Sequence, residues 1–148
     1  RRMPNWRAVW ALGLLIPLFP SLVLGGDFNK FAPLKKDELS QYSGQQIFEA
    51  AHQAYVCSFL MHQAGQAAKG RFLRWYSVNL MQEKKVRDYG KNWNDVNFPG
   101  ALSGTALSDQ YSKRFNVPQS AAARMLLNDD PQCKTLNRFS ERALTQQK

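Results

Sequence analysis

The sequence is poor in the residues that build β-sheets and in those that carry common catalytic chemistry. After residue 26 its only β-branched side chains are Ile47, five valines and three threonines, too few and too scattered for strands. It has two histidines, and it contains neither the G-x-S-x-G motif of a serine nucleophile nor a phosphate-binding glycine loop. Internal repeats and low-complexity tracts are also missing. The sequence therefore predicts an all-α protein that is not an enzyme.

Helix geometry separates the few candidate metal ligands. At about 100° per residue, His52 and His62 point in different directions from one helix, and Cys57 lies on a third face. Glu49 and His52 form one Glu-x-x-His pair, half of what a di-iron bundle requires, and the sequence has no second copy. We interpret both residues as solvent-facing groups on the helix surface. We expect no metal and no cofactor.

Residues 1–26 have the order of basic, apolar and small residues that is typical of a secretory signal peptide. Three arginines stand among the first seven residues, residues 8–24 carry no charge, and Val23 to Gly25 offers an acceptable cleavage site. We predict a signal peptide here and a periplasmic or secreted protein. The alternative is a membrane anchor over residues 8–24, which would make the chain a single-pass membrane protein.

Cys57 and Cys133 are the only two cysteines of the chain. An even number of cysteines in an oxidising compartment predicts a disulfide bond. Closing a loop of this length would stabilise the fold by about 4 kcal/mol in the chain-entropy model. The alternatives are two separate buried thiols in a reducing compartment and a nucleophilic pair of Cys57 with His62.

A polar segment without periodicity, residues 27–42, predicts an extended stretch that leads into one helical domain over residues 43–148. Ser43 and Gln46 predict a capping box at the start of the first helix. Apolar residues at helical spacing predict a central core helix that continues to about residue 68, where Gly70 ends or bends it.

Four further segments of helical pattern follow, so we expect a domain of four to five helices. Their predicted ranges are 71–89, 106–115, 119–128 and 135–146. Gly90 is the predicted stop of the first of them. Residues 90–104 are rich in Asn, Gly and Pro and predict a loop that Trp93 and Phe98 anchor onto the core.

Basic residues dominate the charge of the chain, which is +9 overall. Residues 1–26 hold three of the 20 basic side chains and none of the 11 acidic ones, so the remainder carries +6. This charge favours a protein or envelope partner with an acidic surface, or a membrane through residues 8–24; we do not expect nucleic acid.

Residues 69–93 interleave basic and aromatic side chains and contain the candidate surface for an anionic partner. Its members are Arg71, Arg74, Trp75, Lys84, Lys85 and Arg87. The alternative interpretation is an amphipathic helix with aromatic residues in the core and a solvated basic face.

Residues 107–127 resemble a helix-turn-helix motif. Ser112 takes the small-residue position of the first helix, Asn116 the left-handed position of the turn, and Val117 the buried position after it. The resemblance implies that Gln119, Ser120 and Arg124 would face a DNA groove. Asn116 replaces the usual glycine, and three alanines stand where base-reading side chains would be expected.

Taken together, these patterns predict an exported, disulfide-bonded, non-enzymatic helical binding protein that acts in the cell envelope. An inhibitor, an immunity protein or a small subunit of an envelope assembly would fit this description. The alternative is a DNA-binding protein that uses residues 107–127.

Overall fold

The structure, a computed structural model, describes residues 36–146, and the regular structure of these residues is entirely helical. The all-α prediction is confirmed for this part of the chain. The elements are η1 (Lys36–Gln41), α4 (Gly44–Gln63), α5 (Ala67–Met81), α6 (Lys84–Asp88), α7 (Asn94–Phe115), α8 (Gln119–Asp129) and α9 (Pro131–Thr145).

Two sequence predictions concern the N-terminal part of the chain. The predicted signal peptide or anchor lies outside the described residues, as does most of the segment 27–42. The end of that segment was wrongly predicted as extended, because Lys36–Gln41 forms the 3₁₀ helix η1 and buries Leu39. In residues 36–146, none of the helices combines the length and hydrophobicity that crossing a bilayer requires.

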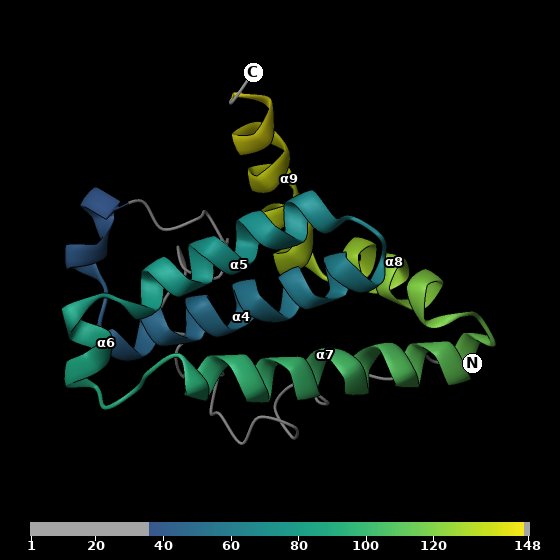
Figure 1. The fold of residues 1–148 in the computed structure, drawn as a ribbon, viewed down its shortest axis with the longest axis horizontal. Helices are drawn as coiled ribbons and strands as arrows, with labels where there is room; N and C mark the ends of the chain where they lie inside the picture. The colour runs from purple at the N-terminus through teal and green to yellow at the C-terminus, as the bar shows by residue number, and fades with distance from the viewer. Residues whose placement is uncertain (1–35, 147–148) are drawn as a thin grey trace.

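Helix α4 is the centre of the fold, and Figure 1 shows it between α5 and α7. It begins with the predicted capping box: the Ser43 hydroxyl accepts from the Gln46 amide at 3.1 Å, and the Gln46 side chain accepts from the Ser43 amide at 2.9 Å. Fourteen of its 20 residues are buried. A helix buried nearly all round can pack against neighbours on every side, and α4 contacts each of the five other α-helices.

The turn between α4 and α5 is built on Gly65 rather than on Gly70. Gly65 has a φ of +81°, a left-handed conformation that glycine adopts without a steric penalty. The amides of Gly65 and Gln66 donate to carbonyls in the last turn of α4. Gly70 instead lies inside α5, where a Cβ atom would come within 2.7 Å of the His62 ring. Gly70 therefore allows the backbone of α5 to approach the His62 ring closely, and it does not end a helix.

Residues 71–89 were predicted as one helix but form two, α5 and α6. The break falls at Gln82 and Glu83, and Glu83 has an extended backbone conformation. Arg87 donates to the carbonyl of Gln82 at 2.6 Å and so satisfies a group that the broken helix leaves free. The change of direction allows Val86 to be fully buried. Gly90 follows α6 with a φ of +82°, as predicted for the stop.

Helix α7 begins at Asn94, so the predicted loop over residues 90–104 was wrong. Pro99 lies within the helix, and Gly100 and Gly104 follow it on the face toward α4. A Cβ atom at Gly100 would lie 2.4 Å from the Tyr55 ring, and one at Gly104 would lie 2.5 Å from the Phe59 ring. The glycines that suggested a loop are therefore positions where aromatic rings of α4 fit against the α7 backbone.

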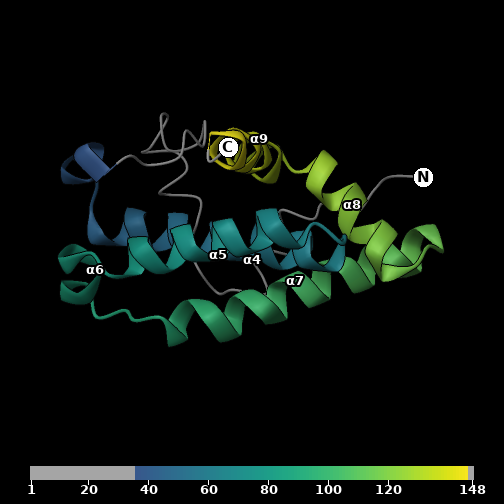
Figure 2. The ribbon, with the colours of Figure 1, turned by 45° about the horizontal axis from the view of Figure 1, so that its top comes forward.

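The last two helices complete the fold at the far end of α7. Asn116 joins α7 to α8 with a φ of +51°, and the Ser112 hydroxyl donates to the Val117 carbonyl at 2.6 Å. Asp130 caps α9 and Pro131 occupies its first turn, so this helix starts earlier than the predicted residue 135. Figure 2 shows α9 nearly end-on while α4, α5 and α7 run lengthwise, so α9 crosses them steeply.

The predicted disulfide bond joins Cys57 of α4 to Cys133 of α9. Their Cα atoms lie 5.4 Å apart, and both side chains are fully buried. The bond closes a separation of 76 residues and ties the central helix to the helix that crosses it. Because both sulfur atoms are bonded to each other, the alternatives of two free thiols and of a Cys57–His62 nucleophile are wrong for this structure.

Candidate binding surface

The outer side of α5 carries half of the predicted anionic-partner surface. Arg71, Arg74 and Trp75 fall within one turn and are all exposed, and Trp75 exposes 59% of its surface. These three residues are called the α5 face below. The Arg74 guanidinium lies over the Trp93 ring at 5.6 Å from its centroid, a cation–π contact. Arg71 makes no hydrogen bond or ion pair with another described residue.

The other half of the predicted surface, on α6, makes contacts within the fold. Lys85 donates to the backbone carbonyls of Ser40 and Tyr42, at 2.8 Å each, and so fixes η1 against α6. Lys84 forms an ion pair of 2.7 Å with Asp88. Arg87 caps the end of α5, as described above. Lys84, Lys85 and Arg87 are all exposed, and each has a partner within the segment from Ser40 to Asp88.

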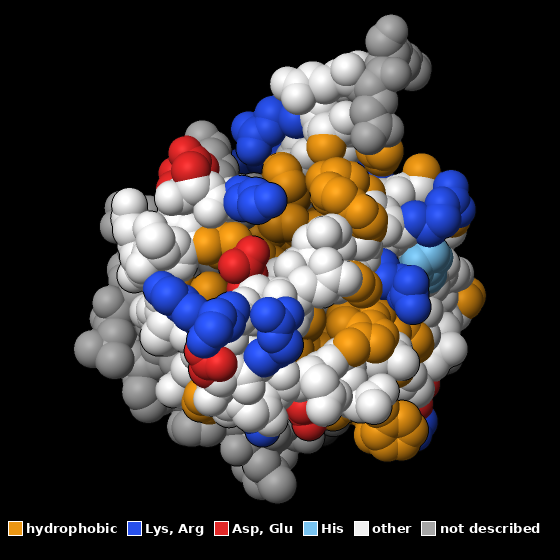
Figure 3. Space-filling view, turned by 60° about the vertical axis from the view of Figure 1, so that its left-hand side comes forward, with side chains coloured by type: hydrophobic (Ala, Val, Ile, Leu, Met, Phe, Trp, Pro, Cys, Tyr) orange, Lys and Arg blue, Asp and Glu red, His pale blue; other side chains and the backbone are white. Residues whose placement is uncertain are grey.

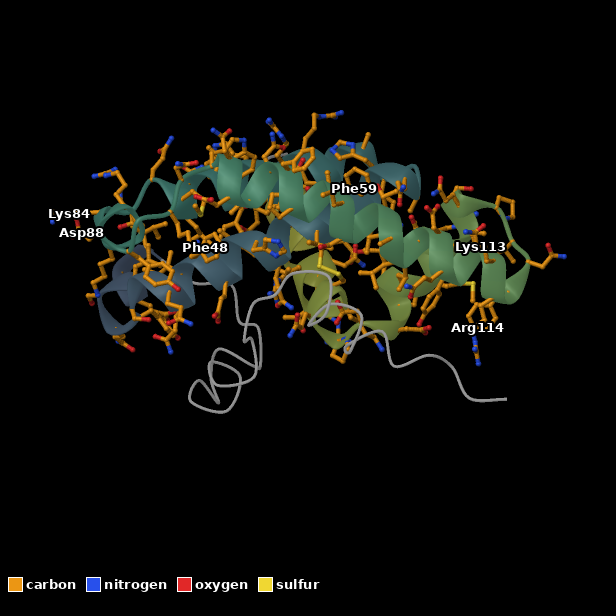
Figure 4. The ribbon with its side chains drawn as sticks, turned by 90° about the horizontal axis from the view of Figure 1, so that it is seen from below. Phe48, Phe59, Lys84, Asp88, Lys113 and Arg114 are labelled. Atoms are coloured by element: carbon orange, nitrogen blue, oxygen red, sulfur yellow. A yellow bond between two sulfur atoms is a disulfide. The ribbon has the colours of Figure 1, made fainter. Side chains whose placement is uncertain are left out.

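Further basic residues of the described chain are also dispersed or paired. Lys69 donates to Glu141 at 2.8 Å and to Asn137 at 3.0 Å, and this hydrogen bond lowers the pKa of the Glu141 carboxyl. Figure 4 places Lys84 at the end of the molecule opposite Lys113 and Arg114. In Figure 3 the lysine and arginine side chains form separate groups, with hydrophobic side chains exposed between them. Net charge alone does not define a binding site here.

A hollow beside α7 is a feature that the sequence analysis missed. It has a volume of about 380 Å³, and Phe59 of α4 and the α7 residues Phe98, Leu102, Ala106 and Asp109 contribute to its walls. Phe98 exposes 69% and Leu102 exposes 56% of its surface, so Phe98 does not anchor a loop onto the core as predicted. The four-residue spacing of Phe98 and Leu102 was the sequence signal that could have placed them on one face of a helix. These residues are called the α7 hollow.

One stripe of α4 contacts residues of both α7 and α5. At one end the Trp93 ring packs edge-on against Tyr55 with centroids 5.2 Å apart, which confirms Trp93 as an anchor. Tyr55 also donates to Asn97 of α7 at 2.8 Å. One and two turns further along α4 come Phe59, which enters the α7 hollow, and His62, which lies against Gly70 of α5. This stripe of α4 therefore contacts α7 through Tyr55 and Phe59 and α5 through His62.

The interior of α4 holds polar side chains that were predicted to face solvent. Glu49 is 2% exposed and His52 is fully buried, so that interpretation was wrong. Neither ring nitrogen of His52 has a hydrogen-bond partner, and burial lowers the pKa of its imidazole to about 4. Because α4 is enclosed on almost every side, even its polar positions are taken out of water. A histidine in this state is neutral at pH 7.

One group of ligand-type residues comes together in the described part of the chain. Cys57, Cys133 and Asp130 are all buried, and their sulfur and carboxylate atoms lie within 4.8 Å of one another. The two sulfur atoms are bonded to each other, and an Asp130 oxygen accepts from the Gln132 amide at 3.0 Å as the cap of α9. The arrangement serves a disulfide and a helix cap, since a metal ion would require free thiolates.

The helix-turn-helix resemblance agrees with the local shape of the structure. Asn116 is left-handed as expected, Val117 packs partly buried against the core, and Ala122 is buried. Of the three candidate base-reading residues, Gln119 donates to Asp109 of α7, Ser120 is partly buried, and Arg124 is exposed. Arg124 is the single basic residue of α8, whereas Asp129 and Asp130 stand at its end. Such a helix presents little positive charge to a phosphate backbone.

Comparison with known proteins leaves this surface to be interpreted from its chemistry alone. The chain matches no protein-family model, no curated protein and no solved structure.

Proposed function

We propose that the chain is an exported, disulfide-stabilised helical protein that binds another macromolecule in the cell envelope and is not an enzyme. An inhibitor, an immunity protein or a small subunit of an envelope assembly is the kind of protein intended. The binding part of this proposal is carried by one observation. Trp75 exposes 59% of its surface within one helical turn of Arg71 and Arg74, and neither arginine forms an ion pair with an acidic residue among residues 36–146.

Exposed tryptophan and arginine are the residue types that contribute most to binding energy at protein interfaces. Apart from its contact with the Phe72 ring, with centroids 5.8 Å apart, the exposed surface of Trp75 contributes little to the fold, because it stays hydrated. Arg74 is pre-positioned by the Trp93 ring, so ordering it on binding costs less side-chain entropy. The α5 face thus combines an apolar anchor with cationic hydrogen-bond donors.

Export is supported by the buried disulfide bond together with the order of residues in 1–26. Disulfide bonds form and persist in oxidising compartments and are rare in the cytosol. The direct test fuses residues 1–26 to a reporter enzyme that is active only outside the cytoplasm. We expect an active reporter. A silent reporter, with the fusion intact in the cytoplasm, would contradict export and leave the binding part standing.

Binding is tested by removing the two arginines of the α5 face. The double variant Arg71→Gln/Arg74→Gln should capture less of its partner from native envelope extracts and show a weaker dependence on salt, because fewer ionic contacts are formed. The matched control is Arg138→Gln/Arg142→Gln on α9, which removes the same charge at exposed positions. Equal loss in both variants would mean that net charge and not the α5 face drives binding.

A further inference from the structure

Helix α7 lies at the edge of the described fold. It packs chiefly against α4 and α8, and in Figures 1 and 2 no other helix of the described chain lies on its outer side. Every fourth residue on that side is exposed, and the middle three, Phe98, Leu102 and Ala106, are apolar. Polar residues, Asn94 and Gln110, end the row. An apolar centre with a polar rim is the usual anatomy of a protein interface.

This side of α7 carries a protruding ring and a recess on the same helix. The Phe98 ring stands mostly in water, and the α7 hollow continues along the helix past the small residues Ala101, Thr105 and Ala106. The volume of the hollow, about 380 Å³, has room for an aromatic side chain, since pockets of roughly 300 to 1,000 Å³ hold small organic molecules. A second copy of α7 would supply such a ring and would offer its own hollow in return.

The charges of α7 define the direction of such a pair. Asp95 lies in the first turn of the helix and Lys113 in the last. A parallel pair would bring like charges together, whereas an antiparallel pair sets Asp95 of each copy against Lys113 of the other. A two-fold axis beside Gly104 gives this register, because it also sets Leu102 opposite Ala106. Each copy then uses the same surface, as a two-fold interface requires.

The acidic side chain in the wall of the hollow is compatible with this partner. The Asp109 carboxylate accepts from the Gln119 side chain of α8, so it already has a donor within the chain. In the antiparallel register, Phe98 of the second copy reaches the end of the hollow near Asp109, where the electropositive edge of the ring can meet the carboxylate. Helix α7 holds two acidic and two basic residues, so two copies of it do not repel each other although the chain carries +9.

Two other occupants fit this side of α7 less well. Helices that lie on a membrane surface carry lysine and arginine beside their apolar stripe, whereas the wall of the hollow contains Asp109 and no basic residue. A small molecule is held in a pocket that covers most of its surface, but here Phe98 and Leu102 themselves stand mostly in water. A second α7 covers both side chains and meets no unbalanced charge.

We infer that two copies of this chain pair through their α7 helices, which run antiparallel about a two-fold axis. Phe98 of each copy enters the α7 hollow of the other, and Asp95 of each copy pairs with Lys113 of the other. The inference goes beyond the proposed function and does not rest on it. Helix α5 lies on the other side of α4 from α7, so the pair leaves the α5 face free (Figure 1). The dimer presents two α5 faces, which raises the avidity for a partner that offers two sites.

The first test measures the oligomeric state of the full chain by sedimentation velocity. A narrow contact predicts a dissociation constant in the micromolar range, so the samples span about 1 to about 500 µM. Phe98→Ser/Leu102→Ser should raise this constant at least about tenfold, because it removes the apolar centre. The control Trp75→Ser removes an exposed ring from α5 and should leave the constant within about twofold of the parent. A monomer at every concentration, or equal effects of the two variants, would overturn the inference.

The second test concerns the direction of the pair. Lys113→Asp should weaken the dimer by about fivefold or more, because it sets two aspartates against each other at both ends. The double variant Asp95→Lys/Lys113→Asp should recover most of the affinity. Lys134→Asp on α9 makes the same change of net charge at an exposed position and should leave the dimer within about twofold. A double variant that pairs no better than Lys113→Asp would contradict the antiparallel register.

A third test does not depend on whether these variants fold. A photo-cross-linking residue replaces the exposed Gln110, and the full chain is irradiated alone, with phosphatidylglycerol vesicles, and in native envelope extract. We expect a product of twice the chain mass in which position 110 is joined to the first two turns of α7. A link between position 110 and the last turns of α7 would exclude the antiparallel pair. Products formed only with lipid, or only with a different protein, would overturn the inference and assign this side of α7 to that ligand.

Discussion

Helices α4 and α7 have similar lengths, 20 and 22 residues, yet they treat polar and apolar side chains in opposite ways. Helix α4 buries the polar residues Glu49, His52 and Gln53, whereas α7 exposes the apolar residues Phe98 and Leu102. Fourteen residues of α4 are buried, compared with seven residues of α7. Position in the bundle explains the difference: α4 is enclosed by its neighbours, and α7 has one side on the surface. Buried polar residues and exposed apolar residues are therefore the positions at which function or strain should be sought.

The largest loss of stability should come from removing the disulfide bond that joins α4 to α9. The double variant Cys57→Ala/Cys133→Ala should lower the free energy of unfolding by about 4 kcal/mol, because the disulfide closes a 76-residue separation and limits the entropy of the unfolded chain. Urea denaturation of the variant against the parent measures this. A loss below about 1 kcal/mol would show that α4 is held by its neighbours alone.

The second effect concerns the polar interior of α4 and depends on pH. His52 has a pKa of about 4 in the folded chain, below its ordinary value of 6.5, so the unfolded chain binds the proton more readily. Its contribution to stability is fully present above pH 6.5 and is lost as the pH falls toward 4. The free energy of unfolding should fall by about 2 kcal/mol between pH 7 and pH 5, and by about 3 kcal/mol by pH 4.

The variant His52→Leu should lose most of this dependence between pH 7 and pH 5, where few carboxyl groups titrate. Denaturant titrations at the two pH values provide the measurement. Replacing the exposed His62 with glutamine is the control and should leave the dependence in place. An unchanged slope in His52→Leu would mean that another group carries it.

A third, smaller effect tests the contact between the two helices. Gly100→Ala places a Cβ atom against the Tyr55 ring, which Asn97 and Trp93 hold in position. Alanine favours a helix over glycine by about 1 kcal/mol, but we expect the clash to exceed this gain and destabilise the fold by about 1 to 2 kcal/mol net. In a Tyr55→Leu background the same change should be neutral or stabilising, and a double-mutant cycle measures the difference. A loss of equal size in both backgrounds would refute the contact.

The smallest effect is expected on the outer side of α7. Phe98→Ser and Leu102→Ser should each change the free energy of unfolding by less than about 0.5 kcal/mol, because both side chains are already in water. Val96→Ala, on the buried side of the same helix, should cost about 2 kcal/mol. Thermal or chemical unfolding compares the three. If the serine variants are as damaging as Val96→Ala, the outer side of α7 belongs to the fold and not to a binding site.

Local sequence signals predicted those elements that local interactions determine. The Ser43–Gln46 capping box, the stop at Gly90 and the left-handed Asn116 all depend on residues a few positions apart. The disulfide was predictable because only two cysteines exist. The first half of α7 was missed because Pro99, Gly100 and Gly104 are typical loop residues. The fit of Gly100 and Gly104 to the rings of Tyr55 and Phe59 is a tertiary contact.

Local sequence signals also account for the part of the candidate surface that lies on α5. Arg71, Arg74 and Trp75 are one turn apart, so helical periodicity placed them together. Lys84, Lys85 and Arg87 were predicted to continue the helix of the α5 face because the break at residues 82–83 was not visible, and the bond from Lys85 to Ser40 depends on the tertiary fold. The burial of Glu49 and His52 could not be predicted, since a helix sequence does not reveal how many neighbours surround it.

The disulfide bond also decides what a single proteolytic cut would do to the molecule. Cys57 and Cys133 lie on either side of the exposed turn between α6 and α7, at Gly90 and Asn92. A protease that cleaves there would produce two peptides that remain covalently joined. The nicked protein should migrate as one species on a non-reducing gel and as two on a reducing gel. The bond would therefore keep α4 and α9 covalently joined after such a cut.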